Sequence, residues 1–256
     1  TAVLTIALTA LPHLFSLGGD FHYDDGHSLV RNPHVRDLGT AVRAFWDPSL
    51  FGENPVDRMY RPLVFAANAM TYAVFGLSPT VYIATNLLIH CVNAYLVTRI
   101  AMLLGASASI GLLSGLLFGL HPAQTEAVNY ISARSESIAA LFVMASCVCY
   151  LGGRSEKRAL GTAGLFALGL LCKSTALVLP AMLLAIEFTI RKKPHVALRV
   201  HLPIWVIAIA YLALYQSIAR IAESTLERDP IIQIATQTKA LIHYAFLASF
   251  PSHLSI

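Results

Sequence analysis

Two adjacent carboxylates, Asp24 and Asp25, lie just after the first apolar run of the chain. Paired carboxylates can act as a general base toward an acceptor hydroxyl, or they can bind a divalent cation. An Asp-Asp-Gly sequence is also common in solvated turns, so the pair alone leaves catalysis and a simple turn as alternatives. If the pair is catalytic, we expect Asp24 or Asp25 to be the base.

A second polar block, HPAQTEAVNYISARSES at residues 121–137, lies between two apolar runs. Pro122 suits the first turn of a helix, so the block predicts a helix with polar side chains on one broad arc: Glu126, Asn129, Tyr130 and Arg134. Charged residues between apolar spans tend to line wet cavities or to pair with each other. The block therefore predicts either part of a site or a surface helix with a structural Glu–Arg pair. His121 alone is more typical of a helix end than of a catalyst.

Two cations stand close to apolar sequence. Lys173, in LLCKSTALVLP, has no other charged residue within ten positions. Its ammonium can extend along the apolar surface to reach water, or it can bind a phosphate held at membrane depth. Arg61, in YRPL, is a comparable phosphate-binding candidate. By contrast, the stripe of Asn86, His90 and Asn93 is more typical of hydrogen bonds between helices than of ligands.

The elements that must position these residues are helices in a membrane. Mean hydropathy is +0.64, and 12% of the residues are charged, against about a quarter in an average soluble protein. The apolar runs are continuous rather than alternating, which predicts an all-α polytopic membrane protein and not a β-barrel. The basic residues are spread over short loops, so the net charge of +4 does not indicate nucleic-acid binding. No nucleotide-binding loop and no metal-ligand spacing is present.

The long polar segment at residues 18–61 carries half of the acidic residues of the chain, seven of 14. They are Asp20, Asp24, Asp25, Asp37, Asp47, Glu53 and Asp57. A loop of this length is usually functional or disordered. Its aromatic residues and prolines predict a folded cap on the membrane body, with juxtamembrane helices of its own.

The apolar runs predict a bundle of about eight transmembrane helices within a single domain, residues 1–256. The run Pro62–Gly76 is shorter than the ~20 residues needed to cross a bilayer, so we expect a re-entrant or juxtamembrane helix at 62–76. A polar segment, Ala219–Lys239, separates the last two runs. The other expected spans are Thr1–Leu17, Val81–Leu104, Ser107–Leu120, Ser137–Leu151, Ala159–Cys172, Thr175–Ile190, Leu202–Ile218 and Ala240–Ile256. Because both ends fall in apolar sequence, we expect a C-terminal part beyond Ile256.

The distribution of basic residues predicts the orientation, because Lys and Arg concentrate in cytoplasmic loops. One basic cluster is Arg154, Lys157 and Arg158, and the other is Arg191, Lys192, Lys193 and Arg199. If 62–76 does not cross the membrane, both clusters fall opposite the acidic loop. The segments 18–61, 121–137 and 220–237, together with Lys173, then converge on the non-cytoplasmic face.

Four motifs occur in an order that resembles one family: FHYDDGHSLVRNPHV, YRPLVFAANAMTYAVFGLSPTVYIATNLLIHCVNAYLV, HPAQTEAVNYISARSE and LLCKSTALVLP. They are similar to the membrane part of the transmembrane-and-tetratricopeptide O-mannosyltransferases and their bacterial relatives. That family lies within the C-type (GT-C) glycosyltransferase superfamily. The resemblance covers essentially the whole chain, and the FxYDD and HPxxTEAV motifs are its more specific parts.

The resemblance implies transfer of a mannose-like sugar from a polyprenyl-phosphate donor to a hydroxyl of a protein or glycan on the non-cytoplasmic face. It implies a catalytic pair, Asp24 and Asp25, a donor-phosphate set of Arg61, Arg134 and Lys173, and supporting residues His121, Glu126 and Glu136. No cofactor is identified from the sequence, and a divalent cation stays an open alternative. We expect a bacterial inner membrane rather than the endoplasmic reticulum, with tetratricopeptide repeats beyond the chain.

Three positions depart from the family pattern. The family Lys-Glu pair is Lys173-Ser174 here, its Gly-Arg pair is Ala133-Arg134, and Gln124 replaces a histidine. The missing glutamate keeps a second interpretation open, in which the chain is an inactive GT-C-like scaffold within a larger membrane complex. A transporter or flippase is the third alternative, but the sequence shows no acidic residue at the middle of a span.

Overall fold

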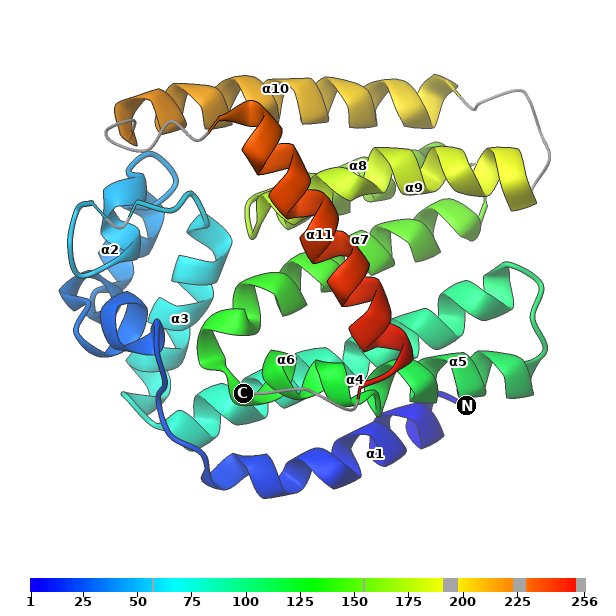
Figure 1. Cartoon of the computed structure of the whole chain (residues 1–256), viewed down its shortest axis with the longest axis horizontal. Coiled ribbons are helices and arrows are strands. Elements are labelled where there is room, and N and C mark those ends of the chain that lie inside the picture. The colour runs from blue at the N-terminus through cyan, green and yellow to red at the C-terminus, as the bar shows by residue number, and fades with distance from the viewer. Residues whose placement is uncertain (57, 154, 191–197, 223–228, 252–256) are drawn as a thin grey trace.

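The computed structural model describes residues 1–56, 58–153, 155–190, 198–222 and 229–251. In these ranges every regular element is helical (Figure 1), which confirms the all-α prediction. Several residues singled out from the sequence lie outside the described part: Asp57, Arg154, Arg191, Lys192 and Lys193. The side chains of Arg199 and Arg220 lie outside it as well.

Three described helices are long and apolar enough to cross a membrane, judged by length and composition. They are α4 (Pro79–Leu103), the segment Ile131–Leu151 that contains α7 (Arg134–Leu151), and His201–Ile218 within α10 (Leu198–Ala222). Four shorter apolar helical segments accompany them: Ala2–Gly18, Pro62–Phe75, Ala108–Gly119 and Ser174–Thr189. The first begins with α1 (Ala2–His13), and the last contains α9 (Leu179–Ala185).

The ends of the helices follow from local sequence. Ser107 caps α5 (Ala108–Gly119) by accepting a hydrogen bond from the Ile110 N–H, and Ser155 caps α8 (Glu156–Leu170) in the same way. Pro79 occupies the first turn of α4, where its missing N–H costs nothing. The helix α3 (Pro62–Phe75) stops at Gly76, whose φ of 63° is a conformation that glycine adopts readily.

A stripe of three glycines lets α5 approach its neighbours closely. Gly111, Gly115 and Gly119 recur every four residues and face α4 and α1, which is typical of helix packing in membranes. A Cβ atom on Gly115 would overlap the Thr98 hydroxyl and lie 2.7 Å from the Ala94 carbonyl oxygen. The spacing of these glycines was visible in the sequence, and its packing role emerges only in the structure.

Two sequence predictions about helix boundaries are wrong. The block 121–137 is not one helix, because Tyr130 is extended and separates α6 (Thr125–Asn129) from a 3-10 turn at Ile131–Ala133. The last described helix, α11, spans Pro230–Ser249 rather than beginning at Ala240, so the expected polar segment is largely helical where described. Asp229 caps α11 through the Ile231 N–H, and Pro230 fills its first turn.

The polar segment 18–61 forms the expected folded cap. It contains α2 (Leu38–Arg43) and short helical turns at Gly26–Val30, Pro33–Arg36 and Pro48–Phe51. Its buried apolar side chains form a common core with α3 and α4: Leu29, Val35, Ala41, Ala44 and Leu50 from the cap meet Phe65, Ala69 and Tyr82. Figure 1 shows α3 running across the ends of α4 and α7 rather than along them.

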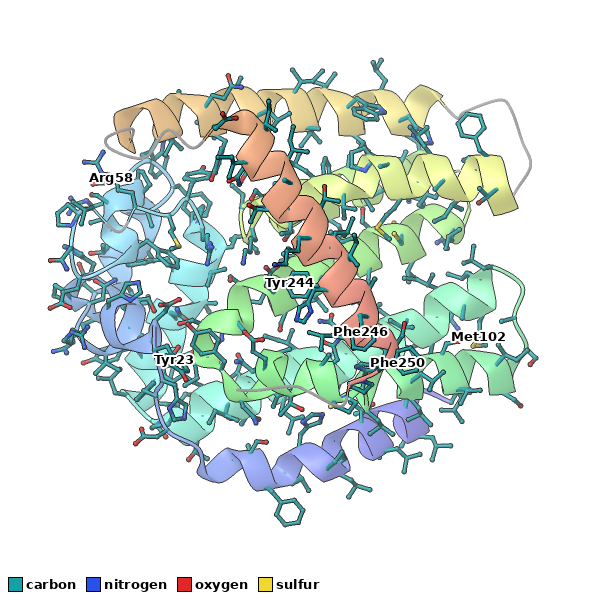
Figure 2. All side chains as sticks on the ribbon, viewed as in Figure 1. Tyr23, Arg58, Met102, Tyr244, Phe246 and Phe250 are labelled. Carbon is teal, nitrogen blue, oxygen red and sulfur yellow. The ribbon has the colours of Figure 1, made fainter. Side chains whose placement is uncertain are left out.

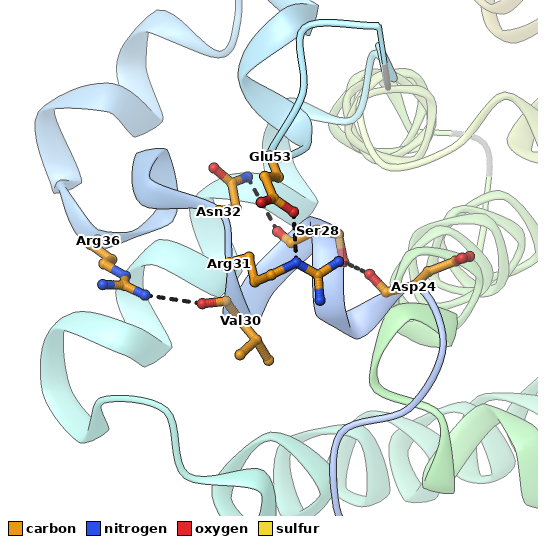
Figure 3. Close-up of polar contacts among 7 residues, drawn as sticks. All are labelled: Asp24, Ser28, Val30, Arg31, Asn32, Arg36 and Glu53. Carbon is orange, nitrogen blue, oxygen red and sulfur yellow. Dashed lines mark hydrogen bonds and ion pairs between the residues drawn. The ribbon is translucent and has the colours of Figure 1, made fainter.

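A buried asparagine holds the cap together. The Asn32 amide donates hydrogen bonds to the carbonyl oxygens of Ser28, Leu50 and Phe51, and its own oxygen accepts the His34 N–H. On the surface of the same loop, Arg31 pairs with Glu53 at 2.7 Å, and Arg36 donates to the Val30 carbonyl (Figure 3). The Asn32 amide therefore joins three parts of the cap from the inside, whereas the charged contacts of Arg31 and Glu53 lie at its surface.

Substitution of Gly115 by alanine tests the glycine stripe. Because the added methyl group meets backbone as well as side-chain atoms, α5 must move away from α4, at a cost of about 1–3 kcal/mol. We expect a lower thermal unfolding temperature in detergent. Gly164→Ala is the matched control, since no atom lies within 4 Å of its Cβ position in α8. An unfolding temperature for Gly115→Ala as high as that of Gly164→Ala would contradict the packing account.

Candidate functional site

A polar cleft of about 220 Å³ opens where the cap meets the bundle. Its walls come from three parts of the chain that are far apart in sequence. The cap and the start of α3 contribute Asp24, His27, Ser28, Phe51, Met59, Arg61, Val64 and Asn68; the α6–α7 segment contributes Glu126, Tyr130, Ile131, Ser132, Ala133, Ser135 and Glu136; Lys173 completes the lining. Parts of 18–61 and 121–137 therefore lie together with Lys173, as expected, whereas no described residue of 220–237, which was expected on the same face, lines this cleft.

The two adjacent carboxylates face opposite environments. Asp25 is fully buried, with 0% of its surface exposed, and does not line the cleft. One of its oxygens accepts the Ser132 N–H at 2.8 Å and the Ser132 hydroxyl, and the other accepts the His22 N–H at 2.9 Å. Asp25 thus ties the start of the cap to the segment before α7, and its carboxylate has no free face toward a substrate.

Asp24 is the exposed member of the pair and lines the cleft. Its side chain points away from the Arg31–Glu53 pair (Figure 3). Its backbone N–H donates to the Tyr130 hydroxyl at 3.3 Å. Burial, and next the hydrogen bond with the Asp24 side chain, raise the pKa of Tyr130 to about 12. The phenol therefore stays protonated at neutral pH, and it can donate to the Asp24 carboxylate.

The carboxylate pair does not fit a divalent cation. Both oxygens of Asp25 already accept N–H or O–H donors, so the two side chains cannot share one ion. Among the described residues, no group of three or more His, Cys, Asp or Glu side chains is close enough to hold a metal.

Arg134 does not face the cleft, and its expected role in phosphate binding needs correction. Only 1% of its surface is exposed. Its guanidinium donates at 2.9 Å to the side-chain oxygens of Asn68 and Asn86 and to the Tyr82 carbonyl, and it stacks over the Tyr82 ring. All three acceptors come from α3 and α4. Arg134 is a buried connector of three helices, because these contacts hold it in the interior and outside the cleft lining.

The cationic side of the cleft consists of Arg61 and Lys173. Lys173 forms an ion pair with Glu136 at 2.5 Å, and Thr175 donates to the second Glu136 oxygen. Arg61 donates to the Ser135 hydroxyl at 3.2 Å and lies over the Phe51 ring. Burial lowers the pKa of Arg61, and the attraction of Glu136 opposes that shift. Glu136 is therefore the acidic partner of Lys173 in this structure.

The two remaining expected supporting residues lie at different places. Glu126 lines the cleft, and its carboxylate makes no ion pair or hydrogen bond with the described residues. His121 lies outside the lining, where it accepts the Ala123 N–H and caps the turn that follows. Its other ring nitrogen lies 3.0 Å from the Ala248 carbonyl oxygen of α11. His121 is thus a helix-end residue, as its position alone suggested.

The asparagine and histidine stripe on α4 makes contacts between helices, as expected. Asn86 donates to the Tyr130 carbonyl, His90 pairs with the Gly119 carbonyl, and Asn93 donates to the Ser137 carbonyl. Sequence reasoning missed two residues that shape the site, Ser132 and His27. Neither belongs to a spacing pattern that indicates a function, so only the folded structure identifies them.

The sequence of the chain is similar to those of several curated proteins. The chain is 33% identical over 153 residues to Protein O-mannosyl-transferase tmtc2 of Xenopus laevis, which covers 58% of this chain and 18% of that protein. It is 34% identical over 149 residues to Protein O-mannosyl-transferase Tmtc1 of Drosophila melanogaster, covering 57% and 16%. Protein O-mannosyl-transferase Tmtc2 of the same fly is 32% identical over 198 residues, covering 69% and 20%.

The matched region spans about a fifth of the length of these relatives. No family model and no solved structure matches the chain. The comparisons therefore support similarity to the transmembrane-and-tetratricopeptide O-mannosyltransferases over 57–69% of the chain.

Replacement of Arg134 by methionine tests its structural role. Loss of the guanidinium leaves the buried side-chain oxygens of Asn68 and Asn86 without a donor, each costing about 1–3 kcal/mol. We expect a large drop in thermal stability or failure to fold. Arg31→Met is the control, because Arg31 forms only an exposed pair with Glu53. A stable Arg134→Met protein that had lost only its affinity for polyprenyl phosphate would restore the original assignment.

Proposed function

We propose that this chain is the membrane part of a glycosyltransferase of the transmembrane-and-tetratricopeptide O-mannosyltransferase family, within the GT-C superfamily. It transfers a mannose-like sugar from a polyprenyl-phosphate donor to a hydroxyl of a protein or glycan. One observation carries the proposal. A single cleft presents an exposed carboxylate, Asp24, together with two cations, Arg61 and Lys173. The names of the relatives support the sugar and the reaction class.

Each side of the cleft has one task in the transfer. Asp24 takes the proton of the acceptor hydroxyl as its oxygen attacks the anomeric carbon of the sugar. The bond between that carbon and the phosphate oxygen breaks, and the configuration inverts. Polyprenyl phosphate leaves with one more negative charge than it had in the donor. Lys173 and Arg61 stabilise this developing charge. Asp25 holds the Asp24 backbone in place and does not touch the substrate.

Glu136 makes donor binding an exchange of anions. Its carboxylate holds Lys173, and a phosphate that reaches Lys173 must replace it or share the ammonium with it. Thr175 continues to hold the second Glu136 oxygen during this exchange. An inactive scaffold is the competing interpretation, and it requires the Lys173–Glu136 pair to be permanent.

The topology is part of the same proposal. About eight helices of one domain, residues 1–256, cross the membrane, with the loop at 18–61 on the non-cytoplasmic side of a bacterial inner membrane. The helix at 62–76 lies along that surface, and the prenyl tail occupies a groove between spans. The transverse course of α3 in Figure 1 supports this position.

Asp24→Asn tests the catalytic base. We expect the turnover of polyprenyl-phosphate mannose by the full-length protein to fall at least 100-fold, because general base catalysis is typically worth 10²–10⁴-fold. Thermal stability should stay near that of the wild type, since the carboxylate is exposed. Asp20→Asn, an exposed carboxylate of the same loop outside the cleft, should retain full activity. Full turnover by Asp24→Asn would refute the assignment.

Lys173→Gln tests the phosphate site. One charge-assisted hydrogen bond is worth about 1.5–3 kcal/mol, so kcat/KM for the donor should fall about 10- to 100-fold while the acceptor KM stays constant. Glu136→Gln frees the ammonium and should strengthen the binding of polyprenyl phosphate, read by equilibrium binding. If neither variant changes binding of polyprenyl phosphate, the pair is a structural contact and the scaffold interpretation gains support.

A further inference from the structure

Two tyrosine rings form a corner beside Asp24. Tyr23 and Tyr130 are perpendicular, at 89°, with ring centroids 6.2 Å apart. Tyr130 lines the cleft, whereas Tyr23 is 80% exposed and lies where the cap meets the bundle (Figure 2). Edge-to-face contact fixes the relative orientation of the rings and leaves one ring face of Tyr23 open to solvent. The corner is therefore an ordered apolar surface at the mouth of the cleft.

The backbone of Tyr23 is held in a costly conformation. Its φ of 45° is the one positive value of a non-glycine residue in the described ranges. Hydrogen bonds on both sides enforce it: the Asp25 N–H donates to the His22 carbonyl, and the Gly26 N–H donates to the Tyr23 carbonyl. Such conformations cost about 1–3 kcal/mol and cluster at ligand-binding sites. Because the ring is exposed, its own burial does not offset this cost.

Two carboxylate residues lie next to the corner. Asp24 adjoins both tyrosines, and Glu126, in α6 just before Tyr130, contributes a second carboxylate. The cations Arg61 and Lys173 line the same cleft, where they are already engaged by Ser135 and Glu136. An aromatic surface with adjacent carboxylates attracts cations and repels phosphate. The corner therefore suits the acceptor and not the donor.

We propose that Tyr23 and Tyr130 form the acceptor subsite, and that the acceptor is an extended polypeptide with a basic residue close to its reacting Ser or Thr. The proposal rests on the proposed function and names its acceptor class. A Lys or Arg side chain packs on the open Tyr23 face near Asp24 and Glu126, and this contact delivers the neighbouring hydroxyl to Asp24. A neutral glycan offers no charge for this surface, which is why a polypeptide fits it better.

Tyr23→Ala tests the subsite in the full-length protein in nanodiscs. With a peptide that carries Lys two residues from its Thr, we expect the acceptor KM to rise about tenfold while the donor KM and kcat change little. Tyr23→Phe should restore the wild-type KM, because the ring and not the hydroxyl makes the contact. Tyr244→Ala, an exposed tyrosine on α11, is the control and should have no effect. An unchanged acceptor KM for Tyr23→Ala would overturn the proposal.

A binding experiment separates this inference from the proposed function. Fluorescent peptides with Lys, Gln or Glu at that position are titrated into the wild-type protein without donor lipid, where no transfer occurs. We expect the Lys peptide to bind at least tenfold more tightly than the Glu peptide, and Tyr23→Ala to abolish the difference. Equal binding of all three peptides, or transfer to a neutral glycan that exceeds transfer to the Lys peptide, overturns the inference alone. Absence of transfer to every acceptor counts against the proposed function instead.

Discussion

The hydrogen bonds between Asp25 and Ser132 are the constraint on which the cleft depends. They join residues 107 positions apart, and they carry a carboxylate into the interior, where it is stable only because donors surround it. Two residues further on, Arg134 is fixed to α3 and α4. The segment between Tyr130 and Arg134 is therefore held by Asp25 of the cap and, at Arg134, by α3 and α4. These contacts fix the positions of Asp24, Tyr130 and Glu136. The geometry of the site therefore depends on buried charged residues that do not themselves react.

This arrangement assigns different tasks to neighbouring residues of the same type. Asp25 and Arg134 face inward and hold the structure, whereas Asp24 and Lys173 face the cleft. Removal of a buried partner leaves a charge or a carbonyl without compensation, which destabilises the fold. Removal of a cleft residue changes only what the cleft can bind. A substitution in these motifs can therefore abolish activity either by destabilising the fold or by changing the cleft. Measurements of thermal stability distinguish the two cases.

The sequence predicts the fold class because the hydropathy of consecutive residues can be read directly from it. Continuous apolar runs indicate helices in a membrane, and the polar segments 18–61 and 121–137 are expected on one face because two spans separate them if 62–76 does not cross the membrane. Hydropathy does not show which residues of the site are buried and structural and which face the cleft. Whether Asp24 or Asp25 is buried depends on Ser132, and the partner of Lys173 is Glu136, which precedes it by 37 positions. The early start of α11 was missed because its cap, Asp229, counted as part of a polar segment.

A double-mutant cycle for stability tests the central claim most directly. Asp25→Asn, Ser132→Ala and the double variant are compared with the wild type, and Asp24→Asn with Ser132→Ala provides the reference cycle. The account predicts a coupling energy of about 1.5–3 kcal/mol between positions 25 and 132, typical of a hydrogen bond to a charged group, and almost none between positions 24 and 132. Additive effects at positions 25 and 132, or equal coupling in both cycles, would contradict it.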